Sequence, residues 1–256
     1  MTPAKNRRTQ ILERLERQGE VRIKELSEEL RCSEVTIRND IQELAAEGYL
    51  HRTHGGAVLN NNELTISFST GEYLSHREEK SRIAQKAYEY INNRDSIIID
   101  DSTSCYYLAK VIRKNTEKKI IVVTNSLITA AELSSAKHVE LFVLSGHVVG
   151  MPPAMLDTFT IEALKQFNVS KAFIGVNGIN LQKGLASLGA IQRDVKMAIL
   201  RAADELYVLA DHTKFEGGRL FSICDMSAVN RIITDSGVPD NIRKVGRELY
   251  LPIDYV

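Results

Sequence analysis

The chain has 256 residues, of which 43% are hydrophobic and 26% charged, a composition typical of soluble globular proteins with one or two domains. Its 33 lysine and arginine residues are balanced by 33 aspartate and glutamate residues, so the formal net charge is zero. That balance argues against a highly basic coat protein for RNA or chromatin and against a polybasic membrane binder, although it allows local basic patches.

The N-terminal residues carry no recognisable targeting signal. Basic residues such as Arg7 and Arg8 are not followed by an apolar stretch, so we expect no signal peptide. No apolar run approaches the ~18 residues that a membrane-spanning helix needs. We therefore expect a cytoplasmic protein, in which the three widely separated cysteines are reduced thiols rather than parts of a disulfide framework.

Residues 1–58 have the pattern of three short amphipathic helices followed by a β-hairpin. Apolar residues recur at helical spacing in a first helix, which ends at Gly19, and again in a second helix. Ser33 is placed to cap a third helix that runs to about Ala46. Residues 49–58 predict a β-hairpin with its turn near a glycine pair. This outline predicts a winged helix-turn-helix domain.

One face of the third predicted helix carries side chains that suit the major groove of DNA. At 100° per residue, Ile37, Ile41 and Leu44 lie on the opposite face, toward the other helices. Asparagine and glutamine can bond adenine, arginine can bond guanine, and valine can touch a thymine methyl group. Basic residues outside this helix are candidates for phosphate or minor-groove contacts. The predicted DNA-binding residues are Lys5, Arg7, Arg8, Ser33, Val35, Thr36, Arg38, Asn39, Gln42, Arg52 and His54.

Charge and periodicity alone do not distinguish DNA binding from an alternative in which the third helix is a solvent-exposed part of a protein-interaction bundle. Residues 1–58 hold ten basic and ten acidic side chains, so they carry no excess of positive charge. Two motifs favour DNA binding instead. The segments 33–40 (SEVTIRND) and 52–57 (RTHGGA) together resemble the DNA-binding domain of the DeoR family, which regulates sugar catabolism in bacteria. Asn39 stands where this family usually has a second arginine. We expect an adenine contact, or no contact, in place of a guanine contact at that position.

A polar stretch without sustained periodicity predicts a linker over residues 59–76. After it, short continuous apolar runs alternate with helical segments. Such runs imply a mostly parallel sheet covered by helices on both faces, so residues 77–256 are predicted to form a larger α/β domain. The predicted strands are residues 97–99, 120–123, 139–144, 172–176, 206–210 and 232–233.

Hydroxyl, amide and charged residues follow several of these predicted strands. In open α/β sheets, ligands bind beyond the carboxyl ends of the strands, where helix N-termini and backbone N–H groups accept anions. Singly, such residues often only cap helices, but their repetition at successive strand ends suits a phosphorylated sugar or polyol. The predicted effector-binding residues are Asp100, Ser102, Thr103, Ser104, Thr124, Asn125, Ser126, Gly146, Lys196, Asp211 and Lys214.

These strand-end loops also resemble the effector domain of the DeoR family, which is similar in fold to ribose-phosphate isomerase. The resemblance implies that a sugar phosphate or related metabolite binds here, and that it relieves repression by altering DNA affinity. Two positions depart from the family: Ser102 and Ser145 stand where many relatives have glycine. A side chain at Ser102 either narrows the anion-binding loop or adds a hydroxyl contact.

Three functions therefore have to be compared. Asp100 or Asp211 with Lys196 or Lys214 supplies the residue types of an acid/base pair, which makes an isomerase-like enzyme with an appended DNA-binding domain the alternative to a regulator. A DNA-reading domain on the same chain favours sensing, because the useful output is then coupling between two sites. A protein-docking adaptor, the third class, predicts no salt-dependent DNA binding.

The sequence predicts no cofactor and no metal, since it contains neither a dinucleotide-binding fingerprint nor a P-loop. Its histidines do not show metal-ligand spacing along the chain. These are His51, His54, His76, His138, His147 and His212. The expected partners are operator DNA, a phosphorylated effector and further copies of the chain. A dimer or tetramer is expected because a single winged module offers too few contacts for tight operator binding.

Overall fold

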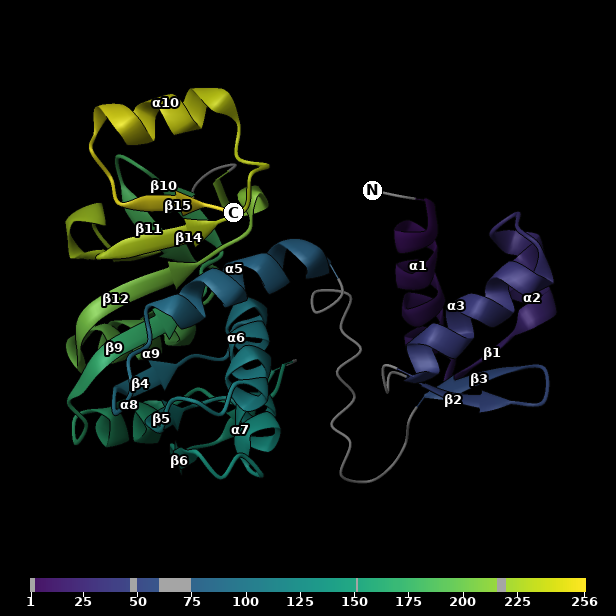
Figure 1. Ribbon diagram of the computed structural model, residues 1–256, viewed down its shortest axis with the longest axis horizontal. Helices are drawn as coiled ribbons and strands as arrows, with labels where there is room; N and C mark the ends of the chain where they lie inside the picture. The colour runs from purple at the N-terminus through teal and green to yellow at the C-terminus, as the bar shows by residue number, and fades with distance from the viewer. Residues whose placement is uncertain (1–2, 47–49, 60–74, 151, 216–219) are drawn as a thin grey trace. The chain divides into compact units, whose positions relative to one another are not determined.

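A computed structural model of the chain describes residues 3–46, 50–59, 75–150, 152–215 and 220–256. The chain forms two compact units, Met1–Ser75 and His76–Val256 (Figure 1). Most of the predicted linker, residues 60–74, lies outside the described residues, as does Tyr49 at the start of the predicted hairpin.

Within its described residues, the first unit consists of three helices and a three-stranded antiparallel sheet. The helices are α1 (Pro3–Gln18), α2 (Ile23–Glu29) and α3 (Glu34–Ala46). The strands are β1 (Glu20–Arg22), β2 (Leu50–Thr53) and β3 (Gly56–Leu59), and β3 lies between the other two. The helices α2 and α3 and the β2–β3 hairpin confirm the predicted winged helix-turn-helix.

The core of the first unit is built from the apolar faces of all three helices and from the sheet. Its buried side chains are those of Ile11, Leu12, Leu15, Val21, Leu26, Ile37, Ile41, Leu44, Leu50 and Ala57. Gly56 is required where the hairpin meets β1, because a Cβ atom there would lie 1.9 Å from the carbonyl oxygen of Val21. The burial of Ile37, Ile41 and Leu44 confirms which face of α3 is turned inward, so the other face is left for a partner.

A fully parallel seven-stranded sheet forms the centre of the second unit, with the strand order β15-β14-β12-β9-β4-β5-β6. The predicted α/β fold is thereby confirmed. The strands are β4 (Ser96–Ile99), β5 (Ile120–Thr124), β6 (Val139–Val143), β9 (Val169–Ile174), β12 (Ala203–Leu209), β14 (Arg231–Thr234) and β15 (Ile253–Tyr255). Because all seven strands run in one direction, the polar residues that follow them lie along one edge of the sheet.

Helices cover both faces of this sheet, as its continuous apolar strands require. In Figure 1, α5 (Arg77–Glu89), α6 (Thr103–Lys114) and α7 (Leu127–Leu133) lie in front of the sheet, and α8 (Thr158–Leu164) and α9 (Ala190–Arg201) lie behind it. The last helix, α10 (Asp240–Glu248), precedes β15. None of the helices in the described residues is long and apolar enough to cross a membrane.

Two smaller sheets and two 3-10 helices complete the second unit. The strands β10 (Gly178–Asn180), β11 (Gly184–Ser187) and β13 (Phe221–Cys224) form an antiparallel sheet, and β7 (Val148–Val149) pairs with β8 (Ala154–Met155). The 3-10 helices are η1 (His212–Phe215), which follows β12, and η2 (Met226–Ala228). The sequence pattern does not predict the smaller sheets or β15.

Candidate functional site

The exposed face of α3 presents the residue types that the sequence places against DNA. Val35 is 64% exposed, and Arg38, Asn39 and Gln42 are exposed on the same helix. The Arg38 guanidinium lies 3.2 Å from the Glu34 carboxylate, but both groups face solvent, and such pairs contribute about 0–1 kcal/mol. Arg38 can therefore exchange this partner for a base or phosphate at little cost.

Ser33 begins α3 in the way the sequence predicts. Its hydroxyl oxygen accepts a hydrogen bond from the backbone N–H of Thr36 at 3.1 Å and lies 2.8 Å from the hydroxyl of Thr36. This cap fixes the first turn of the helix, from which Val35 projects. In the wing, Arg52 lies on β2 and His54 lies in the turn that follows, and both side chains are exposed.

Arg7 and Arg8 lie on α1 and contact α3 rather than pointing away from the unit. The Nε atom of Arg7 lies 2.5 Å from Oδ2 of Asp40, and Nε of Arg8 lies 3.1 Å from Oδ1 of the same carboxylate. Asp40 is only 2% exposed, and Arg8 also pairs with Glu43. The hydrogen bond to Asp40 raises the pKa of Arg7. The contact of Arg7 and Arg8 with DNA stays a prediction, and the side chain of Lys5 lies outside the described part of the chain.

Asp40 links α3 to α1, a contact that the sequence pattern does not predict. It lies three residues after Ile37 and one before Ile41, on the inward face of α3, where an unpaired carboxylate would be costly. An acidic residue on an apolar helix face, with two adjacent arginines elsewhere in the unit, is the signal that could have revealed this pair. The three side chains tie α1 to α3 and so fix the angle at which α3 is presented.

In the second unit, Asp100 is the centre of a buried hydrogen-bond cluster at the end of β4. Its carboxylate is fully buried and forms an ion pair with Nζ of Lys196 from α9. It also accepts hydrogen bonds from the backbone N–H of Gly175 at 3.0 Å and of Ser102 at 2.9 Å. This carboxylate therefore holds the ends of β4 and β9, the start of α6 and the middle of α9 together.

Charges around this cluster keep Lys196 protonated. Burial alone would lower the pKa of Lys196, but the negative charges of Asp100 and Asp101 outweigh this effect and raise it. Burial raises the pKa of Asp101, and the charge of Lys196 opposes that increase. Both oxygens of Asp100 already accept hydrogen bonds from the protein, and one of these bonds comes from Lys196, its ion-pair partner.

Several predicted effector-binding hydroxyl groups serve as caps in the structure. Ser102 caps α6 by accepting from the N–H of Cys105 at 3.3 Å, and Ser126 caps α7 by accepting from the N–H of Thr129 at 3.2 Å. The hydroxyl of Thr124 donates to the carbonyl of Ile99 at 2.7 Å and accepts from the N–H of Ser126 at 3.0 Å. Thr103 is the first residue of α6, and Ser104, next to it, is buried.

Asn125 differs from these neighbours because only the nitrogen of its side-chain amide forms hydrogen bonds with described residues. The side chain is fully buried between β5 and α7, and its Nδ2 donates to Asp101 and to the carbonyl of Met155, each at 3.3 Å. Its Oδ1 atom has no hydrogen-bond partner among the described residues. Leaving such a buried acceptor unpaired costs about 1–3 kcal/mol.

Gly146 follows β6, and its close packing requires glycine. It has a φ of +148°, and a Cβ atom there would lie 2.3 Å from the Thr160 hydroxyl. Thr160 and Asp157 begin α8, and Asp157 accepts from the backbone N–H groups of Thr160 at 2.8 Å and of His147 at 2.5 Å. These hydrogen bonds lower the pKa of Asp157. The close contact with the start of α8 thus explains why residue 146 is a glycine.

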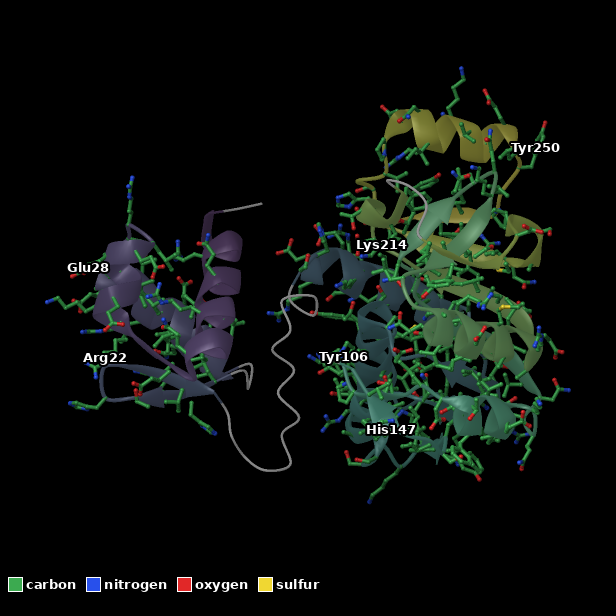
Figure 2. The ribbon with its side chains drawn as sticks, turned by 180° about the vertical axis from the view of Figure 1, so that it is seen from behind. Arg22, Glu28, Tyr106, His147, Lys214 and Tyr250 are labelled. Atoms are coloured by element: carbon green, nitrogen blue, oxygen red, sulfur yellow. The ribbon has the colours of Figure 1, made fainter. Side chains whose placement is uncertain are left out.

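The remaining predicted residues, Asp211 and Lys214, follow β12. Asp211 is buried and accepts from the N–H of Thr213 at 3.1 Å, while Lys214 lies in η1. In the sheet, only β9 separates β12 from β4, so the residues that follow these two strands lie along the same edge. In Figure 2, Lys214 and His147 are both labelled on the left-hand side of this unit, Lys214 above His147.

Gly175 packs closely against the side chain of Ser102 within the cluster, which gives a direct test of its packing. A Cβ atom at Gly175 would lie 2.3 Å from Cβ of Ser102. Gly175→Ala should therefore destabilise the second unit by about 1–3 kcal/mol, because a Cβ atom cannot rotate away. Urea denaturation followed by circular dichroism measures this change.

The matched control for this substitution is Gly189→Ala, where the nearest atom is the flexible end of Gln192 at 3.2 Å and a smaller effect is expected. The double substitution Gly175→Ala with Ser102→Gly should recover most of the lost stability, since glycine replaces a capping serine at a cost of a few tenths of a kcal/mol. If the double variant is no more stable than Gly175→Ala, a clash with the Ser102 side chain is not the cause of the lost stability.

Comparisons with known proteins agree with this geometry. Residues 7–63 match the family model described as the DeoR-like helix-turn-helix domain, and residues 75–236 match the one described as the DeoR C terminal sensor domain. The HTH-type transcriptional regulator YulB of Bacillus subtilis (strain 168) is 32% identical over 91% of this chain and 89% of its own length.

Two further relatives are repressors by name. The putative aga operon transcriptional repressor of Escherichia coli O157:H7 is 29% identical over 98% of this chain and 95% of its own. The lactose phosphotransferase system repressor of Lactococcus lactis subsp. lactis is 31% identical over 91% of this chain and 92% of its own. Among solved structures, ribose 5-phosphate isomerase A from Methanocaldococcus jannaschii aligns with a TM-score of 0.42 and 14% identity over 55% of each chain.

Proposed function

The chain belongs to the DeoR family of transcriptional regulators, and from this membership and the strand-end cluster we propose that it represses a carbohydrate catabolism operon under the control of a phosphorylated sugar or related metabolite. The names of its relatives support the class of target, because they include repressors of an aga operon, a lactose system and a glycerol-3-phosphate regulon. The observation that carries the effector proposal is the buried Oδ1 atom of Asn125, which lacks a protein partner among the described residues.

We propose that α3 reads the major groove and that the wing contacts the adjacent backbone. The residues that would touch bases are Val35, Arg38, Asn39 and Gln42, and those that would touch phosphates or the minor groove are Lys5, Arg7, Arg8, Ser33, Thr36, Arg52 and His54. Support comes from the exposure of the base-reading set and from the cap that fixes the start of α3. Arg7 and Arg8 would act mainly through Asp40, which sets the angle of α3.

Asn39→Arg tests the base-reading assignment. Asn39 is exposed on α3, and asparagine pairs with adenine whereas arginine pairs with guanine. The variant should therefore change the preferred base at one operator position from adenine to guanine, with about 1–3 kcal/mol of discrimination. Selection of binding sites from a random DNA pool measures this preference for both proteins. If the preferred base stays the same at every position, Asn39 does not read the operator.

For the effector, we propose binding at the carboxyl edge of the sheet, over the ends of β4, β5 and β12. A sugar hydroxyl would donate to Oδ1 of Asn125, and the anionic group would meet Lys214 and the N-terminus of α6, where Ser102, Thr103 and Ser104 begin the helix. Asp100 and Lys196 would position these loops without touching the ligand. Movement of these loops toward the anion would then change the distance between the α3 helices of two copies of the chain.

Sensing fits this site better than turnover. An acid/base catalyst needs a group that is free to exchange a proton with the substrate, but Asp100 and Lys196 are paired with each other in a buried ion pair. Incubation of the full chain with a panel of sugar phosphates tests this point. Release of operator DNA without product formation supports the regulator, whereas product formation would favour the isomerase-like alternative.

We propose that the chain acts as a homo-oligomer, since a lone winged module buries little surface on DNA. The edge strand β6 offers one surface for self-association, because Phe142 and Val143 are 41% and 47% exposed on it. An edge strand with exposed apolar side chains is a template for pairing with another strand. Sedimentation of the protein with and without operator DNA measures the number of copies.

A further inference from the structure

Two histidines and one aspartate meet at the carboxyl edge of the sheet, beyond the cluster around Asp100. His76 immediately precedes α5, whereas Asp211 and His212 follow β12. Each can offer one ligand atom, and these three atoms lie within 4.8 Å of one another. The rings of His76 and His212 meet edge to face, with centroids 5.1 Å apart and planes at 89°. Their separation along the chain explains why sequence spacing gave no sign of this group.

We propose that His76, Asp211 and His212 bind a divalent first-row transition-metal ion, with Zn²⁺ as the best fit. Two imidazole nitrogens and one carboxylate oxygen form a donor set that holds zinc or iron(II) with further coordination positions open. Bonds of about 2.0–2.1 Å in a tetrahedral site bring ligand atoms to about 3.4 Å from one another. Small rotations of the partly exposed His76 and His212 side chains would shorten the present distances between the ligand atoms to this value.

A second carboxylate already orients one of the two imidazoles. Nδ1 of His212 lies 2.8 Å from Oδ2 of Asp235, and the backbone N–H of His212 donates to Oδ1 of the same residue at 2.7 Å. Asp235 is itself buried and accepts from the N–H of Gly237 at 2.8 Å. A carboxylate at Nδ1 fixes the tautomer that leaves the Nε2 lone pair for a metal, an arrangement found around metal-bound histidines.

Asp211 supplies the carboxylate of this group, and it is buried where the positive charges of Lys214 and Lys80 act on it. The two lysine charges also repel a divalent ion. We therefore expect an affinity lower than that of structural zinc sites, with an exchangeable ion.

His76 is held in a conformation that its position just before α5 does not require. Its φ is +54° and its ψ +37°, in the left-handed region, and its side chain makes no capping hydrogen bond to α5. Strained backbone of this kind is concentrated at ligand and switch sites. His76 is the first residue of the second unit, so a bound ion would fix the end of the connecting segment to the end of β12.

A titration of the full-length, tag-free protein with Co²⁺ tests the inference, with visible absorption as the readout and Zn²⁺ as competitor. After treatment with a chelator, the wild-type protein should bind one Co²⁺ per chain, and Zn²⁺ should displace it. His76→Asn should weaken binding by more than about 100-fold, beyond the loss expected for an outer partner of a ligand. Asparagine is chosen because it tolerates positive φ.

The matched control is His147→Asn, because His147 is an exposed histidine of the same unit that follows β6; it should bind Co²⁺ like the wild type. Asp235→Asn should weaken binding by about 10–100-fold, since it removes only the orienting carboxylate. Asp211 is not substituted in these tests, because it is also a predicted effector-binding residue. Absence of saturable 1:1 binding, or wild-type affinity in His76→Asn, would overturn the metal site and leave the proposed regulator untouched.

Discussion

Replacing Lys196 with methionine is expected to destabilise the second unit by about 3–5 kcal/mol, the cost of leaving a buried charge without its partner. Lys196 pairs with Asp100, and both side chains are buried. The Asp100 carboxylate also accepts two backbone N–H groups, so it cannot move into solvent without breaking the ends of β4 and β9. Chemical denaturation at neutral pH, followed by circular dichroism, measures the loss.

Lys165→Met is the matched control, because Lys165 forms an exposed ion pair with Glu162 on α8. Its effect should stay within about 0.5 kcal/mol, as for most surface substitutions. If Lys196→Met costs no more than this control, Lys196 is not the counter-ion that the structure indicates. A loss of effector response without a loss of stability would instead place Lys196 in direct contact with the effector.

Replacing Lys214 with alanine should leave operator binding unchanged and weaken the response to the effector by about 10- to 100-fold. The expected loss is that of one hydrogen bond to a charged group, about 1.5–3 kcal/mol. Lys214 lies in η1 of the second unit, whereas α3 belongs to the first. The measurement is the effector concentration that releases half of the bound operator fragment.

Two controls make this result specific. Lys165→Ala removes a charge of the same sign from an exposed position on the same unit, and it should release the operator at the wild-type effector concentration. Equal operator affinity of Lys214→Ala and wild type without effector shows that both proteins are folded. If Lys214→Ala releases the operator at the wild-type concentration, Lys214 does not bind the effector.

The sequence predicts the large elements well because each has a strong local signal. Continuous apolar runs coincide with β4, β5 and β9, and an apolar periodicity marks α3. The strand β15 gives no such signal, since Ile253, Asp254 and Tyr255 are short, mixed in polarity and paired only with β14. The turn at Gly184, which has a φ of +93°, likewise becomes clear only where β11 meets Cys224.

Side-chain partners were harder to predict than elements. The cap by Ser33 follows from local sequence and is confirmed, whereas Ser102 and Ser126, predicted to bind the effector, cap α6 and α7 in the structure. The pairing of Asp100 with Lys196 depends on how α9 packs behind the sheet, which residue types alone do not give. Contacts of Asp40 with α1, and of His76 with the end of β12, likewise arise only when distant segments are folded together.

The central claim is that an effector bound at the carboxyl edge of the sheet changes the affinity of the chain for its operator. The most direct measurement is fluorescence anisotropy of an operator fragment, selected from a random pool, in the presence of phosphorylated three- to six-carbon sugars and polyols. At least one phosphorylated compound should change operator affinity by tenfold or more, about 1.4 kcal/mol of coupling, while its unphosphorylated counterpart does not. Operator affinity that no compound in the panel changes would contradict the account.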